Sequence, residues 1–230
     1  MSWFKKTTAS VKMTTVIALE SLSQDMLEAQ LHLLEAELST AGFSVRRLEF
    51  PSSSAESNVP GLLDTPSLVE SAQSLGIIAA VDRARTFARL GETPEKEVIV
   101  CTGSSLATMA WLTANVEEHG ERIGLYRWLD ELEHMVLSQK RVDFTVFLDC
   151  LPDHIDIHET VLVPVGWGSR EVPEVTTLRE RYIEAAKLTP GAKIISCFRE
   201  DLLKPDSEIQ NELWNLVRRV ALKSNLRPKV

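Results

Sequence analysis

The sequence predicts an α/β protein, a three-layer sandwich with helices on both faces of a mostly parallel, five-stranded sheet. Four short apolar segments rich in β-branched residues alternate with helical patterns, which is typical of a parallel sheet buried on both faces. The chain has 230 residues, of which 44% are hydrophobic, enough for one domain with a sizeable core. We therefore expect strands joined by right-handed helical crossovers.

The predicted strands are residues 16–19, 43–50, 98–100, 144–148 and 193–197. The segment 43–50, FSVRRLEF, is more polar than the others, so we place it at an edge of the sheet. The predicted helices are 27–38, 67–90, 104–118, 125–140, 175–188 and 206–223. In the first of these helices we expect Asp25 to be the N-cap and Gly42 to mark the end.

Residues 1–14 read as a flexible tail, and 15–230 as one domain. Two segments inside this domain lack periodicity, 51–66 and 151–174, and both are rich in proline. Loops of this length in compact domains are often functional or mobile. Both segments are therefore expected to be irregular loops of a functional or mobile kind.

The composition argues against several classes of protein. A formal net charge of −8 disfavours a nucleic-acid binder, because such binding relies on lysine and arginine at phosphates. The cysteines 101, 150 and 197 lack CxxC spacing, which suggests neither a zinc knuckle nor a redox pair and fits a reducing, cytoplasmic setting. We expect no membrane span, since no apolar run reaches about 18 residues. The short basic start MSWFKKTTASVKM leaves organelle targeting open.

The turn after the first predicted strand occupies the place of a nucleotide-binding P-loop. In the motif GxxxxGK[ST], glycines let amides close around phosphate, the lysine neutralises it and the hydroxyl holds magnesium. This chain has Met26, Leu27 and Glu28 at the positions of the second glycine, the lysine and the hydroxyl. An inward-pointing Glu28 would repel a phosphate about 4 Å away by roughly 4 kcal/mol at an effective dielectric near 20. The motif therefore predicts no working P-loop.

The order of the other motifs resembles the thymidylate kinase family from residue 16 to about residue 222. The matching segments are IALE, LEFP, AAVDRAR, RVDFTVFLDCLPD and IQNELWNLVRRVAL. The resemblance implies a P-loop kinase-like fold and a homodimer formed through the helices at 67–90 and 104–118. It also implies a remnant nucleotide site made of Glu20, Ser21, Phe50, Arg83, Ser104 and Ser105.

The departures from the family pattern fall on its chemistry. Residues 52–54 are serines where the family carries an arginine, 101–103 read Cys-Thr-Gly in place of Asp-Arg-Tyr, Ala79 replaces a stacking aromatic, and the lid segment keeps only Arg170. Phosphoryl transfer is catalysed mainly by positioned cations and amides. We therefore predict no catalytic residue, no cofactor and impaired catalysis, with a function in binding a partner protein or a nucleotide-type ligand.

The competing hypothesis is an active nucleoside monophosphate kinase that phosphorylates dTMP with Mg-ATP through a rebuilt phosphate site. It would need substitute cations, for which the candidates are Lys12, Arg46, Arg47 and Arg170. A third hypothesis is a metal-dependent hydrolase built on DHIDIHE, in which His154, Asp156 and His158 share one face of an extended segment. The alternative for DHIDIHE is a solvated loop.

Three further features each have two readings. Cys101 and the amides of 102–104 lie where a strand meets a helix, which fits either a nucleophile beside an anion-binding nest or a buried thiol. Asp82 and Arg83 are either surface charges or a retained contact to a base. Trp167, between two glycines, is our candidate for a partner contact, whereas we expect Trp111, Trp128 and Trp214 to pack in the core.

Overall fold

The protein folds into three layers around one parallel sheet. The computed structural model describes residues 14–51, 71–90, 96–154 and 173–220. The five strands are β1 Thr15–Ser21, β2 Ser44–Glu49, β3 Glu97–Thr102, β4 Phe144–Asp149 and β5 Ala192–Ser196. All pairings in this sheet are parallel, in the order β2-β3-β1-β4-β5. The α/β sandwich predicted from the sequence is confirmed, and so is the edge position of the polar strand β2.

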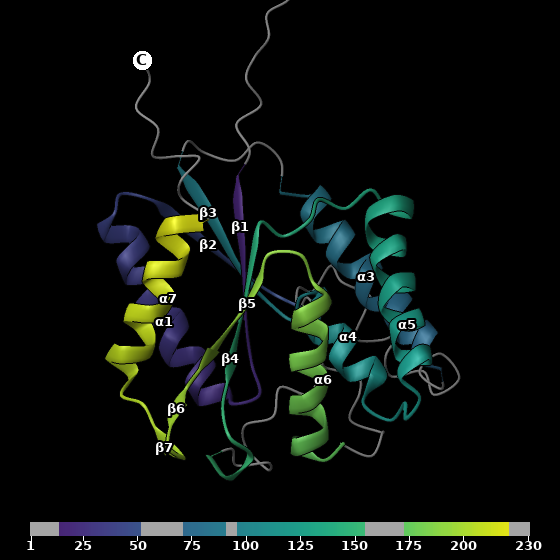
Figure 1. The fold of residues 1–230 in the computed structure, drawn as a ribbon. Helices are drawn as coiled ribbons and strands as arrows, with labels where there is room; N and C mark the ends of the chain where they lie inside the picture. Colours follow the sequence, from purple (N-terminus) through teal and green to yellow (C-terminus); the bar gives the residue numbers. More distant parts are fainter. Residues whose placement is uncertain (1–13, 52–70, 91–95, 155–172, 221–230) are drawn as a thin grey trace, which may run out of the picture.

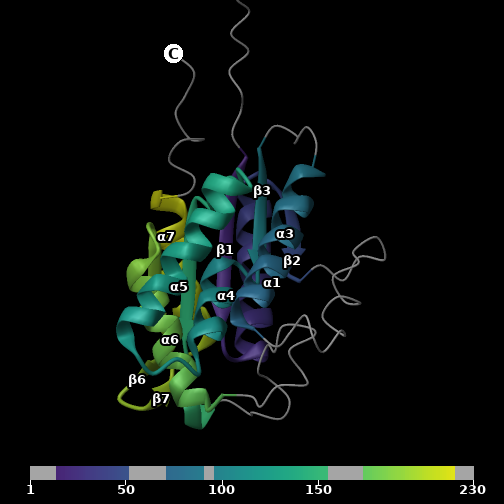
Figure 2. The same cartoon turned by 90° about the vertical axis from the view of Figure 1, so that its right-hand side faces the viewer.

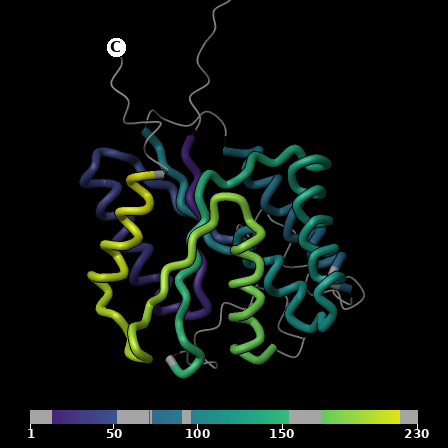
Figure 3. The backbone as a smooth tube through the Cα atoms, in the orientation of Figure 1, coloured from purple at the N-terminus to yellow at the C-terminus, as the bar shows by residue number. Residues whose placement is uncertain are grey.

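The helices lie on both faces of the sheet (Figures 1 and 2). Their bounds are α1 Gln24–Thr40, α3 Ala72–Ala88, α4 Ser105–Thr113, α5 His119–Glu131, α6 Val175–Leu188 and α7 Asp206–Val220. Helices α1 and α7 cover one face, and α3, α4, α5 and α6 cover the other. As the backbone tube in Figure 3 shows, the chain passes through a helical segment after each strand of the sheet before it enters the next strand. A short antiparallel pair, β6 Phe198–Arg199 and β7 Leu202–Leu203, precedes α7.

The central strand β1 anchors the core. All seven of its residues are buried, because it pairs with β3 on one side and β4 on the other and is covered by helices on both faces. The edge strand β2 instead carries ion pairs, two of which reach other elements. Arg46 Nε donates to Glu97 at 3.0 Å, and Arg47 forms a two-pronged pair with Glu28. Glu28 therefore points to β2 and not into the turn after β1, so the inward orientation considered from the sequence is wrong.

Several element boundaries differ from the sequence prediction. The N-cap of α1 is Ser23 and not Asp25, because the Ser23 hydroxyl accepts from the Met26 amide at 3.2 Å. Helix α4 ends at Thr113, five residues before the predicted end. The segment predicted as 125–140 begins at His119, where two glycines hid the first turn, and it continues as the π-helical turn η2, Leu132–Val136.

Several predictions fall outside the described residues. These are the tail 1–13, most of the two irregular segments (52–70 and 155–172), and with them Asp156, His158 and Trp167. His154 ends a short 3₁₀ turn, η3 Pro152–His154. None of the helices in the described part of the chain is long and apolar enough to cross a membrane.

Leu27 lies in the core and not beside an open turn. Its side chain is 1% exposed and packs in the main hydrophobic cluster with Leu31 and Leu34 of the same helix. The position that corresponds to the P-loop lysine thus contributes apolar contacts between α1 and the sheet. A lysine at position 27 would be buried, and the turn before α1 would provide no carboxylate to pair with it.

We predict that Leu27→Lys lowers the free energy of unfolding by about 3 to 5 kcal/mol, because it removes core packing and buries an ammonium group. Leu33→Lys, on the same helix at a side chain that is 38% exposed, is the matched control and should change it by at most about 0.5 kcal/mol. Urea unfolding measures both. Equal effects at the two positions would show that Leu27 does not carry core packing.

Candidate functional site

The connection from β1 to α1 is a tight turn of two residues, Leu22 and Ser23. The Ser21 hydroxyl donates to the Leu148 carbonyl at 3.2 Å and accepts from the Ser23 amide at 3.2 Å. The Ser23 hydroxyl caps α1 at the Met26 amide. The amides of Ser23 and Met26, in the place where a P-loop would direct amides at phosphate, are therefore hydrogen-bonded within the turn itself.

A carboxylate of the protein occupies the amide nest that follows β3. The Ser104 amide donates to Glu20 Oε1 at 2.7 Å, and the Gly103 amide donates to Glu20 Oε2 at 3.2 Å. Two successive amides converging on an anion are the arrangement expected of a nest at a helix start. Here the anion is the side chain that ends the IALE segment, and it is 1% exposed. The predicted nest is present, and Glu20 fills it.

Gly103 is required by close contact with the chain at Phe50. Its φ is +69°, and a Cβ built on it would lie 2.0 Å from the Phe50 carbonyl oxygen. The Phe50 amide also donates to the Thr102 carbonyl at 3.1 Å, and the Phe50 ring packs against Phe87 at 5.7 Å between centroids. A tyrosine at position 103, as in the Asp-Arg-Tyr of the resembling family, would collide with this backbone. The Cys-Thr-Gly sequence therefore has a packing role here.

Arg83 lies inside the protein in a buried ion pair. Its Nε donates to Glu133 Oε1 at 3.1 Å, and its Nη2 forms a short contact to the same oxygen. Its Nη1 donates to the Thr108 hydroxyl at 2.8 Å and to the Gly103 carbonyl at 3.2 Å. The exposed fractions of Arg83 and Glu133 are 2% and 0%. The surface alternative is therefore wrong for Arg83, as it is for Asp82, which is equally buried.

Ser105 completes this cluster. Its hydroxyl donates to Glu133 Oε2 in a short contact, so both oxygens of Glu133 have donors. The cluster thus joins β1, α3, the start of α4 and the turn η2. Glu133 was missed by the sequence analysis because η2 is π-helical, and a π turn shifts the inward face away from the period of 3.6 residues.

Burial and the neighbouring polar groups shift the pKa of Glu20 in opposite directions. Loss of water raises the pKa of Glu20 above its usual value, although the side chain of Ser104, the two amides and the charge of Arg83 favour the carboxylate form. Burial likewise raises the pKa of the Cys101 thiol, and the side chain is 1% exposed. Cys101 is therefore a buried thiol, and its environment does not activate it as a nucleophile.

The carboxyl end of β4 carries a second paired carboxylate. Arg179 on α6 donates to both oxygens of Asp149, at 2.6 and 2.8 Å, and its guanidinium lies over the Phe198 ring at 5.6 Å. Asp149 is 5% exposed. The aspartate of the LDCLP segment is thus held by an arginine of the same chain.

The structure brings together most of the residues predicted for the remnant site. Glu20, Arg83, Ser104 and Ser105 meet around Gly103, and Phe50 packs on the same glycine. Ser21 lies next to Glu20 in sequence but bonds toward β4. Within the described ranges, no group of three or more His, Cys, Asp or Glu residues could hold a metal ion.

Comparisons of the chain with models of protein families and with the sequences of curated proteins gave no match. The resemblance to thymidylate kinases therefore stays a prediction based on the motifs and their order.

Glu20 should make stability depend on pH in a defined direction. Because its folded pKa is raised, the folded protein binds more protons than the unfolded chain above the usual pKa of 4.5, and stability falls as pH rises through that window. Glu20→Gln removes this titration and leaves one nest amide without its carboxylate oxygen, at a cost of about 1 to 3 kcal/mol. The stability advantage of the wild type over the variant should therefore shrink with rising pH.

Urea unfolding at about pH 4.5 and pH 7.5 measures that difference. Glu131→Gln, at an exposed glutamate of α5, controls for the loss of one surface carboxylate. An advantage that stays constant or grows with pH would mean that burial does not dominate the environment of Glu20.

Proposed function

We propose that this chain is a thymidylate-kinase-like protein without phosphoryl-transfer activity, which acts by binding. The observation that carries the proposal is the carboxylate of Glu20 on the amides of Gly103 and Ser104. A phosphate entering this nest would have to displace a buried side chain that already satisfies both donors. A carboxylate left in place would repel the phosphate.

The cations of the remnant site support the same conclusion. Phosphoryl transfer depends on positive groups positioned to contact the phosphoryl oxygens, where charge develops. Arg83 is held by Glu133, Arg179 by Asp149 and Arg47 by Glu28. Removing one partner of a buried ion pair costs about 3 to 5 kcal/mol, so recruitment of Arg83 to a nucleotide would be unfavourable. The kinase alternative therefore depends on Lys12 and Arg170, which lie outside the described residues.

The same contacts favour binding outside the remnant cleft. A nucleotide-type ligand would compete with Glu20 for the amides and with Glu133 for the guanidinium. A protein partner would meet no such competition on the surface. We accordingly prefer a partner protein to a nucleotide, with a second copy of the chain as the first candidate.

Helix α3 supports self-association better than α4. Every residue of α4 from Leu106 to Thr113 is buried within the chain, so this helix has no apolar face to offer. On α3, Ile77 and Val81 lie one turn apart, and each is 45% exposed. The proposed homodimer would therefore pack α3 against its copy.

The catalytic part of the proposal is tested by incubating the purified full chain with Mg-ATP and dTMP and following dTDP. We expect none above the protein-free background. The contradicting result is dTDP formation that co-elutes with the protein on gel filtration and is lost in Lys12→Ala or Arg170→Ala, which would establish the rebuilt-site kinase.

The dimer is tested by sedimentation. We expect wild type to sediment as a dimer and Val81→Glu as a monomer, because a carboxylate would be desolvated in the interface. Asn215→Glu, at an exposed position of α7 on the other face of the sheet, is the matched control and should remain dimeric. A monomeric wild type at micromolar concentration would refute self-association through α3.

A further inference from the structure

A cavity of about 280 Å³ lies between α4, α5 and the end of α6. Its floor includes Thr145 at the start of β4, and its far wall is formed by Leu188 and the two residues that follow it. Thr145 pairs with Ala18, which pairs in turn with Cys101, so the cavity lies close to the carboxyl end of β3 and adjoins the cleft discussed above at Ser104 and Ser105. Its other lining residues are not among those proposed for the remnant site.

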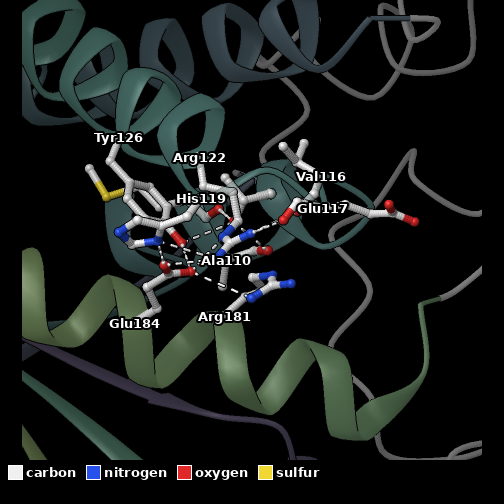
Figure 4. A network of polar contacts seen from close by, with 10 residues as sticks. Ala110, Val116, Glu117, His119, Arg122, Tyr126, Arg181 and Glu184 are labelled. Carbon is white, nitrogen blue, oxygen red and sulfur yellow. Dashed lines mark hydrogen bonds and ion pairs between the residues drawn. The ribbon is translucent and has the colours of Figure 1, made fainter.

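The walls of the cavity are held by a polar network shown in Figure 4. Arg122 on α5 donates to both oxygens of Glu184 on α6, at 2.8 and 3.2 Å, and to the Glu117 carbonyl at 2.6 Å. Tyr126, which lines the cavity, bonds to Glu184 at 3.3 Å and to Thr113 at 3.1 Å. Two-pronged guanidinium to carboxylate pairs fix orientation as well as distance. The spacing of α5 and α6 is thus set before any ligand arrives.

Apolar side chains form most of the lining. Leu106 and Met109 project from α4, Ile123 from α5, and Val142 and Leu188 close the remaining sides. A preformed, largely apolar cavity with a few polar groups is the usual form of a small-molecule site, and its volume is near the lower end of the usual range of roughly 300 to 1,000 Å³. The body of a fitting ligand would be small and apolar.

The polar groups of the cavity leave a positive charge uncompensated. Asp130 accepts from both ends of the Arg141 guanidinium, and His134 lies 3.6 Å from the same carboxylate. Arg127 lines the cavity one turn before this group, is exposed, and forms no ion pair with a carboxylate in the described part of the chain. An anionic group at the mouth would find its partner in Arg127.

Gln139 supplies the second polar requirement. It lines the cavity, is 8% exposed, and its side-chain oxygen has no hydrogen-bond partner among the described residues. Its backbone carbonyl accepts from His134 Nδ1 at 2.9 Å, so the residue is fixed in place. A buried acceptor without a donor is unfavourable. A ligand that carries an O–H or N–H group beside its apolar body would satisfy it.

We propose that this cavity binds a small amphipathic organic anion. The apolar body, aromatic or branched, lies between α4 and α5. Its carboxylate or sulfonate pairs with Arg127, and a donor on the body meets Gln139. The inference goes beyond the proposed function, because it holds whether or not the remnant cleft binds a nucleotide and whether or not the chain forms a dimer.

The test uses two fluorescent probes that differ in one charge. Anilinonaphthalene sulfonate has an aromatic body, an N–H group and a sulfonate, and phenylnaphthylamine is the same body without the sulfonate. Both are titrated into the full chain. We expect saturable binding of one sulfonate probe per chain, weakened roughly tenfold in Arg127→Gln, which removes one charged hydrogen bond. The neutral probe should bind this variant as it binds wild type.

Three controls locate the site. Arg218→Gln, an exposed arginine on α7 across the sheet, should leave both probes unaffected. Ile123→Trp fills the cavity, and Leu188→Trp blocks it from a side chain that is 47% exposed and thus tolerant of substitution. Each tryptophan variant should abolish binding of both probes. The Leu188→Trp variant should do so with an unchanged melting temperature. Unchanged affinity in both tryptophan variants, or absence of saturable binding to wild type, would overturn the proposal.

Discussion

The buried carboxylates of Glu20 and Glu133, with Arg83 beside them, control the architecture around the remnant site. Glu133 holds the guanidinium, and Glu20 holds the two amides at the start of α4. Together these contacts tie β1 and α3 to α4 and to the π-helical turn η2. Charges taken out of water are tolerated only when each is paired and hydrogen-bonded. Glu133 meets this condition through Arg83 and Ser105, and Glu20 is hydrogen-bonded by two amides, although burial raises its pKa. All these donors belong to the chain itself.

The neighbouring features are consistent with this closed cluster. Leu27 packs in the core where a phosphate-binding lysine would need water and a ligand, and the turn before it bonds within itself. Gly103 permits the close approach of the Phe50 carbonyl, which excludes a side chain at that position. Arg179 is paired with Asp149. At each of these places a group that could serve nucleotide chemistry is either absent or bonded within the fold.

The sequence predicts the framework well because the framework depends on periodicity. Apolar runs located four of the five strands, and the more polar segment 43–50 was placed correctly as the fifth, β2, at an edge. Contacts that depend on three-dimensional detail could not be predicted. Glu133 faces inward because η2 is π-helical, which the period of 3.6 residues does not predict. Two glycines obscured the helical pattern at the start of α5. The pairing of Glu28 with Arg47 depends on how α1 and β2 are placed in the fold. Four of the six residues proposed for the remnant site, Glu20, Arg83, Ser104 and Ser105, meet around Gly103, but their bonding partners within the chain were not foreseen.

The central claim is that the amides of Gly103 and Ser104 are unavailable to a phosphate because Glu20 occupies them. The most direct measurement follows the backbone amide resonances of these two residues during separate titrations with Mg-ATP and with dTMP. The account predicts that neither resonance moves at millimolar ligand. A saturable shift of both amide resonances, with release of the Glu20 carboxylate, would contradict the account and would show that the two amides bind the nucleotide.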